Sequence, residues 1–246
     1  MDPDRPNRAA ATRGPPPPPS PADPGPLLLP ARAWRRVLLL VVPIALLLVV
    51  VMVALTSGSG LQRWPEGTVH GPWRSVFDGG GFTGERDGVL VLEPARSQRP
   101  DETHASLVVS TASYGDLRYR VQTRTTEQLR RPAPNSWEVA WVLWHFTDTQ
   151  HFYYLTLKPT GWELGKEDPA YPGSQRFLAT GPPSYPVGPW YAVDIRQTGA
   201  TASVIVDGRH LVDFTDTERP YLQGGVGAYT EDAHTEFRDA SVRPAG

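Results

Sequence analysis

The sequence predicts an all-β protein, a sandwich or jelly roll of antiparallel strands over about residues 66–243. Between Trp64 and Val242 there is no convincing helical periodicity. Instead, about a dozen short runs rich in Val, Leu, Tyr, Trp, Phe and Thr alternate with Gly, Pro and Asp clusters, which is typical of strands joined by turns. The dipeptide Asp207-Gly208, between SVIV and RHLVDF, predicts a two-residue hairpin turn. So many short strands in one domain indicate two packed sheets.

The expected strands follow from these runs and their boundaries. We expect them at residues 74–77, 88–93, 105–110, 117–125, 137–146, 152–158, 162–167, 176–180, 190–197, 201–206, 209–214, 225–229 and 236–242. In strand 190–197, Tyr191, Val193 and Ile195 alternate with polar residues, which predicts one dry and one wet face.

Strand 137–146 differs, because both of its faces are apolar. One row contains Trp137, Val139, Trp141 and Leu143, and the other contains Glu138, Ala140, Val142, Trp144 and Phe146. We expect a central strand with one row in the core and the other lining a groove. We assign the row with Glu138 and Trp144 to the groove.

The N-terminal part predicts a membrane anchor. Residues 1–36 are rich in proline, with five in a row from Pro15 to Pro19, and are expected to form a disordered cytoplasmic tail. Residues 37–55 form an uncharged apolar run long enough for a single transmembrane helix, an uncleaved signal-anchor. Arginines precede this run, so the positive-inside rule places the domain, after a linker at 56–65, outside the cell membrane.

Composition limits how the domain is stabilised and argues against one class of partner. The chain has no cysteine, so an exported domain depends on its own core instead of disulfides. The net charge is −2 and no basic stripe is visible, which argues against nucleic acid as a partner.

Several segments resemble the concanavalin A-like lectin/glucanase superfamily. They are WRSVFDGGGF, DGVLVLEP, HFYYLTLKPTGWELGKED, WYAVDIRQTGATASVIVDGRHLVDFTD and GGVGAYTEDAHTEFRDASV. Within it, the order of strands and the closing segment look most similar to the 3-keto-disaccharide hydrolase domain family, beside laminin-G-like modules. The resemblance implies the jelly-roll fold but leaves lectins, hydrolases and scaffolds open. The Glu-x-Asp-x-x-Glu pattern of family 16 glycosidases is absent.

The expected groove combines aromatic and charged residues. The chain contains only two lysines, Lys158 and Lys166, among many arginines, which indicates that a compact ammonium group is needed there. Trp144, Tyr154 and Lys158 are candidate ligand-binding residues, because aromatic plates and charged groups suit a sugar. The alternative is that the aromatics are core and the charges form a cross-strand ion pair.

The remaining candidate site residues are two glutamates and three residues of one loop. Glu138 and Glu163 form a candidate catalytic pair, since glycoside cleavage needs two carboxyl groups at close distance. In the loop at 165–176, Lys166, Asp168 and Arg176 are candidate ligand-binding residues; the alternative is a structural loop held by an Asp168–Arg176 ion pair.

No cofactor is required by these residues, although Asp239, with a carbonyl from 78–81, is a candidate ligand for a structural calcium ion. Taken together, the sequence predicts a membrane-anchored, extracytoplasmic domain that binds a carbohydrate on its concave sheet. The alternatives are a glycoside hydrolase of the 3-keto-disaccharide hydrolase type and a structural or protein-interaction module. Whether the chain is an enzyme stays open.

Overall fold

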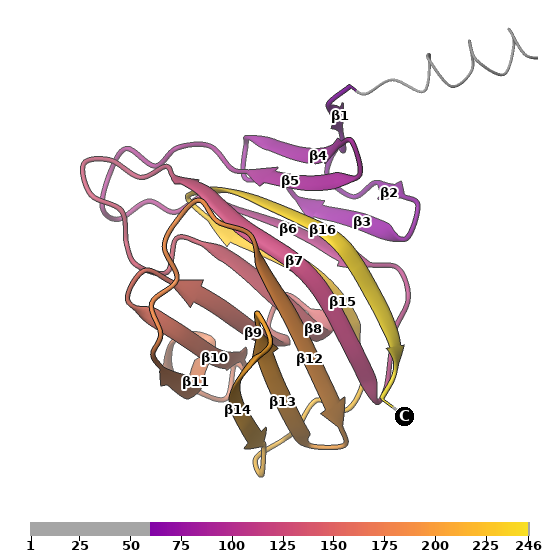
Figure 1. Cartoon of the computed structure of the whole chain (residues 1–246). Coiled ribbons are helices and arrows are strands. Elements are labelled where there is room, and N and C mark those ends of the chain that lie inside the picture. The colour runs from indigo at the N-terminus through magenta and orange to yellow at the C-terminus, as the bar shows by residue number, and fades with distance from the viewer. Residues whose placement is uncertain (1–59, 246) are drawn as a thin grey trace, which may run out of the picture. The chain divides into compact units, whose positions relative to one another are not determined.

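The computed structural model describes residues 60–245, which form a sandwich of two antiparallel sheets (Figure 1). Sheet A has the strand order β1 (Gln62–Arg63), β4 (Phe82–Arg86), β5 (Val89–Glu93), β16 (Ala233–Pro244), β7 (Leu117–Gln128), β12 (Tyr191–Thr198), β13 (Thr201–Val206) and β14 (Arg209–Thr215). Sheet B has the order β11 (Gln175–Gly181), β10 (Gly161–Glu167), β9 (His151–Lys158), β8 (Ala140–Asp148), β15 (Gly225–Glu231), β6 (Ala105–Ser110), β3 (Trp73–Phe77) and β2 (Val69–His70). In this part of the chain the one helical element is the 3-10 turn Pro172–Ser174.

The strand order confirms the predicted jelly roll. The last strand, β16, lies between β5 and β7, so the end of the domain pairs with its beginning. Neighbours in each sheet often come from distant parts of the sequence, as with β15 between β6 and β8. The expected two-residue hairpin is also present: Asp207 and Gly208 have φ of 50° and 76°, and they join Val206 to its partner Arg209.

The core lies between the two sheets and follows the predicted alternation in β12 and β13. Val193 and Ile195 point inward and are buried, as is Val204 opposite Ile195. Gln197 is the buried polar residue at the end of β12, and its side-chain oxygen accepts a hydrogen bond of 2.6 Å from Trp144 Nε1. Trp144 is therefore bound to sheet A across the core.

The two faces of β8 are the reverse of the expected ones. Ala140, Val142 and Trp144 pack in the core between the sheets, whereas Trp141 and Leu143 belong to a second apolar cluster on the opposite face of sheet B. The assignment of Trp144 to a groove is therefore wrong. A bulge at His145, whose φ is 50°, breaks the alternation, so Phe146 lies with Trp141 instead of Trp144.

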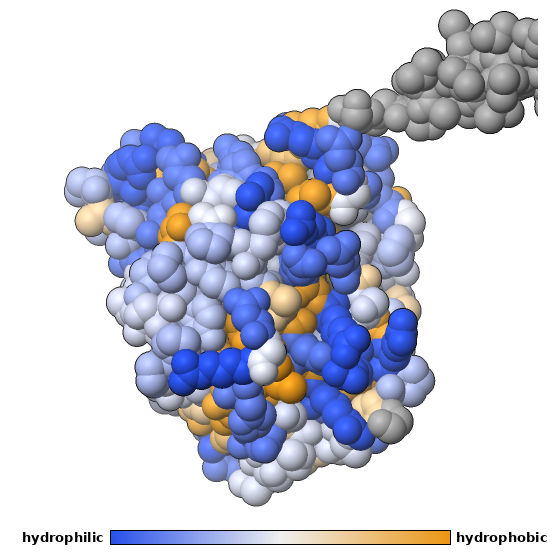
Figure 2. All heavy atoms as spheres, in the orientation of Figure 1, coloured by the Kyte–Doolittle hydropathy of each residue, from blue (hydrophilic) through white to orange (hydrophobic). Residues whose placement is uncertain are grey.

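The outward face of sheet A is mainly hydrophilic, with apolar patches between the charged side chains (Figure 2). Arg118 and Arg120, on β7, both bind Asp194 on β12 at 2.7 and 2.8 Å. On the same face, the guanidinium groups of Arg124 and Arg238 lie 4.6 and 4.1 Å from the ring centroid of Trp190. These ion pairs and cation–π contacts cover part of the outward face of sheet A.

The predicted tail at 1–36 and the predicted transmembrane helix at 37–55 lie outside the described residues. Within residues 60–245, no helix is long and apolar enough to cross a membrane.

Candidate functional site

Sheet B carries a cavity of about 510 Å³ on the face directed away from sheet A. We call it the sheet B cavity. Its aromatic lining residues are Phe77, Trp137, Trp141, Phe152, Phe177 and Tyr229. Trp137 and Phe177 are 45% and 64% exposed, so they form the rim, whereas Trp141 and Phe152 are buried in the floor. Exposed aromatic rings at the mouth of a polar cavity indicate a binding site.

The floor of the cavity depends on a glycine. Tyr154 projects from β9 across Gly165 on β10, and a Cβ atom at Gly165 would lie 2.1 Å from the Tyr154 hydroxyl oxygen. Only glycine leaves room for this ring. Tyr154 in turn packs on Trp141, with ring centroids 4.5 Å apart. Tyr154 lies on the cavity side of sheet B, on the face opposite to Trp144, and its side chain is buried beneath the cavity.

Lys158 and Glu163 both line the cavity, as expected from their positions on neighbouring strands. The Lys158 ammonium lies 2.5 Å from one carboxylate oxygen of Glu163, and the Tyr154 hydroxyl donates to the other at 3.0 Å. This cross-strand ion pair is the alternative that the sequence left open, yet it lies inside the cavity. The pair supplies polar atoms to the cavity without adding net charge.

Two further carboxyl groups, Glu167 and Glu231, line the same cavity. Burial raises the pKa of Glu167 to about 7, and the negative charge of Glu231 adds to the shift. Burial also raises the pKa of Glu231, and the charges of Asp232 and Glu138 act in the same direction. The Tyr229 hydroxyl donates to Glu231 at 2.6 Å. The cavity therefore holds one carboxyl group, Glu167, that can carry a proton near neutral pH, and a second, Glu231, whose pKa is raised as well.

Glu138 does not line this cavity. It is fully buried and bound by the Arg130 guanidinium, which also binds Asp232 at 2.7 Å. The backbone N–H of Asn135 donates to Glu138 at 3.0 Å. The expected catalytic pairing of Glu138 with Glu163 is therefore not supported by the geometry. Glu138 instead fixes the loop that presents Trp137 to the cavity.

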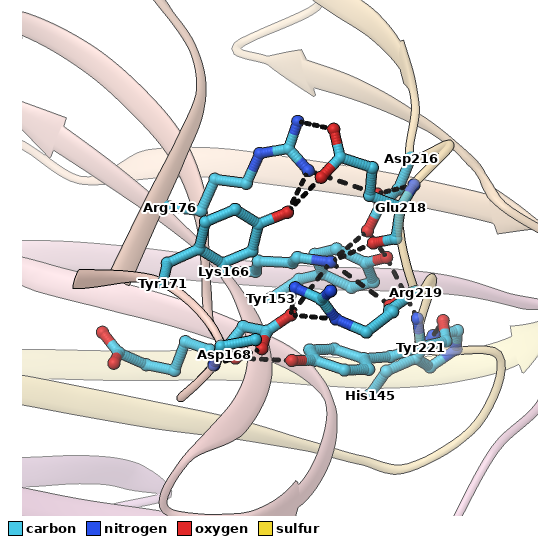
Figure 3. Close-up of polar contacts among 12 residues, drawn as sticks. His145, Tyr153, Lys166, Asp168, Tyr171, Arg176, Asp216, Glu218, Arg219 and Tyr221 are labelled. Carbon is cyan, nitrogen blue, oxygen red and sulfur yellow. Dashed lines mark hydrogen bonds and ion pairs between the residues drawn. The ribbon is translucent and has the colours of Figure 1, made fainter. Parts of the chain in front are cut away.

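Lys166 belongs to a second, closed network (Figure 3). Its ammonium group is fully buried and donates to Asp216 at 2.7 Å and to the backbone oxygens of Glu218 and Arg219 at 2.6 and 3.2 Å. The Tyr153 hydroxyl donates to Asp216 as well, at 2.7 Å. Three acceptors around one point suit an ammonium better than a planar guanidinium, which explains a lysine here.

Asp168 and Arg176 belong to the same network. Asp168 is buried and accepts hydrogen bonds from Arg219 at 3.1 and 3.2 Å, and Arg176 donates to Glu218 at 2.9 Å. Burial alone would raise the pKa of Asp168, but hydrogen bonds from Ala170 and Arg219 hold it below its usual value. Lys166, Asp168 and Arg176 thus tie the loop after β10 to the loop after β14, and none of the three lines the sheet B cavity. The structural alternative fits, although with other partners than an Asp168–Arg176 pair.

Asp239 lies on the outward face of sheet A and does not fit a calcium site. Its carboxylate accepts a hydrogen bond from Gln122 at 2.9 Å, and the carboxylate of Asp78 binds Arg63 and the N–H of Gly80. Across residues 60–245 no three His, Cys, Asp or Glu side chains converge to hold a metal ion.

Sequence reasoning missed most of the residues that line the sheet B cavity. Glu167 could have been predicted from the sequence, because it is four residues from Glu163 on one strand and therefore shares its face. Trp137 and Trp141 could not have been predicted, because both rows of strand 137–146 are apolar and do not show which one faces the core; Tyr229 lies on a separate strand, β15. Glu231 and Phe177 lie on strands at separate places in the sheet, and only the fold brings them together.

The fold defines a class: the all-β jelly roll of two antiparallel sheets. More narrowly, the chain belongs to the 3-keto-alpha-glucoside-1,2-lyase-like domain family, whose model matches residues 54–243. This confirms the resemblance seen in the sequence. A search among curated proteins gave no match.

The solved structures that are similar to this chain are distant from it in sequence. The carbohydrate-binding module CBM66 from Bacillus subtilis is 17% identical with a TM-score of 0.51, over 70% of this chain and 95% of that chain. A Bacillus subtilis protein of unknown function with a galectin-like fold is 13% identical with a TM-score of 0.51, over 75% and 98%. A Bacillus licheniformis beta-glucanase is 12% identical with a TM-score of 0.48, over 75% and 98%. At these identities the likeness concerns the fold alone.

Proposed function

We propose that the chain binds a carbohydrate in the sheet B cavity. The observation that carries this proposal is the combination of exposed rim aromatics, Trp137 and Phe177, with carboxyl groups in the floor. A sugar ring presents an apolar face of C–H groups and an edge of hydroxyl groups, so it needs an aromatic plate beside hydrogen-bond acceptors. Membership of a family named for an activity on glucosides supports the same ligand class.

The rim of the sheet B cavity is preorganised for ligand binding. Trp141 Nε1 donates to the backbone oxygen of Trp137 at 2.9 Å, and the neighbouring Glu138 is held by Arg130. The rim is therefore positioned before a ligand arrives, which lowers the entropy cost of binding.

A glycan screen tests this proposal. The full-length chain in detergent is titrated with a panel of neutral, amino and acidic oligosaccharides, and Trp137→Ala is compared with Trp190→Ala. We expect Trp137→Ala to weaken binding by about tenfold or more, since a stacked aromatic commonly contributes more than 1 kcal/mol. Trp190 lies on the outward face of the other sheet and serves as the matched control. A well-folded chain that binds no sugar would point instead to a protein partner.

An enzyme acting on glycosides is the second candidate, and the carboxyl groups in the cavity favour it. Glu167, with a pKa raised to about 7, can hold a proton for a leaving oxygen at neutral pH. Glu231 lines the same cavity, so the two carboxyls replace the Glu138–Glu163 pair as candidates. Incubation with 3-keto-glycosides and detection of released sugar tests this activity. Binding without product, or product formation that persists in Glu167→Gln, would argue against it.

We further propose that the domain is held outside the cell membrane by a single-pass anchor. The uncharged apolar run at 37–55, with arginines before it, supports this topology. Protease added to intact cells should remove the domain while an epitope at residues 1–36 stays protected. Release of the domain into a soluble fraction without protease would contradict the anchor.

A further inference from the structure

The charges that line the sheet B cavity are unbalanced. They comprise one cation, Lys158, and three carboxyl groups, Glu163, Glu167 and Glu231. Lys158 and Glu163 form an ion pair of 2.5 Å and cancel each other. Glu167 and Glu231 therefore remain as the charges that a ligand meets.

Neither of these two carboxyls has a basic partner among residues 60–245. Glu231 accepts a hydrogen bond from the Tyr229 hydroxyl, which is neutral. For the Glu167 carboxyl, this part of the chain provides no hydrogen bond and no ion pair. Arg130 is the nearest candidate to neutralise Glu231, but its guanidinium already binds Glu138 and Asp232.

Burial and mutual repulsion make the unpaired negative charges of Glu167 and Glu231 unfavourable. Glu167 shares the cavity with Glu231 and lies near the hydroxyl groups of Tyr154 and Tyr229, whose own pKa values burial holds above the usual range. Burial and mutual repulsion raise the pKa of both carboxyls, so at neutral pH they are ionised only against a penalty. A cation placed beside them relieves the burial cost and the repulsion together.

We propose that the sugar bound in the sheet B cavity carries an amine, whose ammonium group faces Glu167 and Glu231. This inference rests on the proposed function and names the class of its ligand: a hexosamine unit with a free amine. Uronates and sialates carry a carboxylate and are repelled by the same two groups. Neutral sugars leave both carboxyls without a counter-charge.

Oligosaccharides that differ in charge but share a backbone test the inference. The full-length chain in detergent is titrated by calorimetry with glucosamine oligomers and with N-acetylglucosamine oligomers of equal length. At about pH 7 we expect the amine form to bind at least about tenfold more tightly. In Glu167→Gln with Glu231→Gln this preference should disappear, whereas Asp87→Asn, on an exposed turn of sheet A, should keep it.

The pH dependence provides a second readout that a change in cavity shape would not produce. Affinity for the amine form should fall by severalfold from about pH 7 to about pH 5.5, because protonation removes the charge of Glu167, whose pKa is raised to about 7. The N-acetylated form carries no ammonium group, so its affinity should stay constant over this interval.

The outcomes separate this inference from the proposed function. Tighter binding of the N-acetylated or an acidic sugar overturns the charge inference but keeps the carbohydrate site. An amine preference that survives in the double variant also overturns it, because the ammonium would then lie elsewhere. Failure to bind any sugar contradicts the proposed function itself.

Discussion

Replacement of Trp144 by alanine should unfold the domain more easily and should not act through the ligand site. Trp144 is fully buried, stacks on Tyr153 with ring centroids 5.5 Å apart, and donates to Gln197 at 2.6 Å. Loss of a buried tryptophan costs about 3–5 kcal/mol. The Gln197 side-chain oxygen then lacks its donor in the core, which adds about 1 kcal/mol or more. The free energy of unfolding should therefore fall by about 5 kcal/mol.

A chain of this size loses about 2–4 °C in Tm for each kcal/mol, so Trp144→Ala should lower the Tm by roughly 10–20 °C. Trp137→Ala is the comparison, because Trp137 is 45% exposed and its loss should cost about 1 kcal/mol or less. Thermal unfolding, monitored by near-ultraviolet circular dichroism, measures the Tm of both variants. If Trp144→Ala shifts the Tm by no more than Trp137→Ala does, the assignment of the two faces of β8 is wrong.

The remaining predictions concern the floor of the cavity and the buried network. Gly165→Ala should destabilise the domain by about 1–3 kcal/mol and displace Tyr154, seen as a changed tyrosine signal, because the new Cβ has no room; an unchanged Tm would contradict this packing. Glu167 has a pKa raised to about 7 in the folded chain, so its contribution to stability is present below about pH 4.5 and is lost as the pH rises through about 7. Glu167→Gln should then stabilise the chain relative to wild type at about pH 8 but not at about pH 4.5, and a pH-independent difference in urea midpoints would refute the raised pKa. Asp216→Asn removes the carboxylate that binds the buried Lys166 ammonium, and it should lower the free energy of unfolding by about 3–5 kcal/mol in urea melts; a loss below 1 kcal/mol would show that Lys166 finds another partner.

Most of the strands could be predicted from the sequence because turns and apolar runs mark them locally. The hairpin at Asp207-Gly208 and the alternation in β12 depend only on neighbouring residues. The short edge strands β1 and β2, and β4 with its sequence FTGER, were not expected, because they lack an apolar run and form only through pairing.

The site was less accessible to sequence reasoning. Parity along β9 could place Tyr154 and Lys158 on one face, because alternation holds over a regular strand. It failed for β8, where both rows are apolar and a bulge at His145 reverses the pattern. The role of Lys166 could not be predicted either, since its partner Asp216 is fifty residues away and only the folded chain brings them together.

The most direct test of the account is a calorimetric titration of the full-length chain with a sugar that it binds, repeated with Trp137→Ala and Trp190→Ala. If the sheet B cavity is the carbohydrate site, Trp137→Ala weakens the affinity by about tenfold or more and Trp190→Ala leaves it unchanged. Equal affinity for wild type and Trp137→Ala, with a loss in Trp190→Ala, would place the ligand on sheet A and contradict the account.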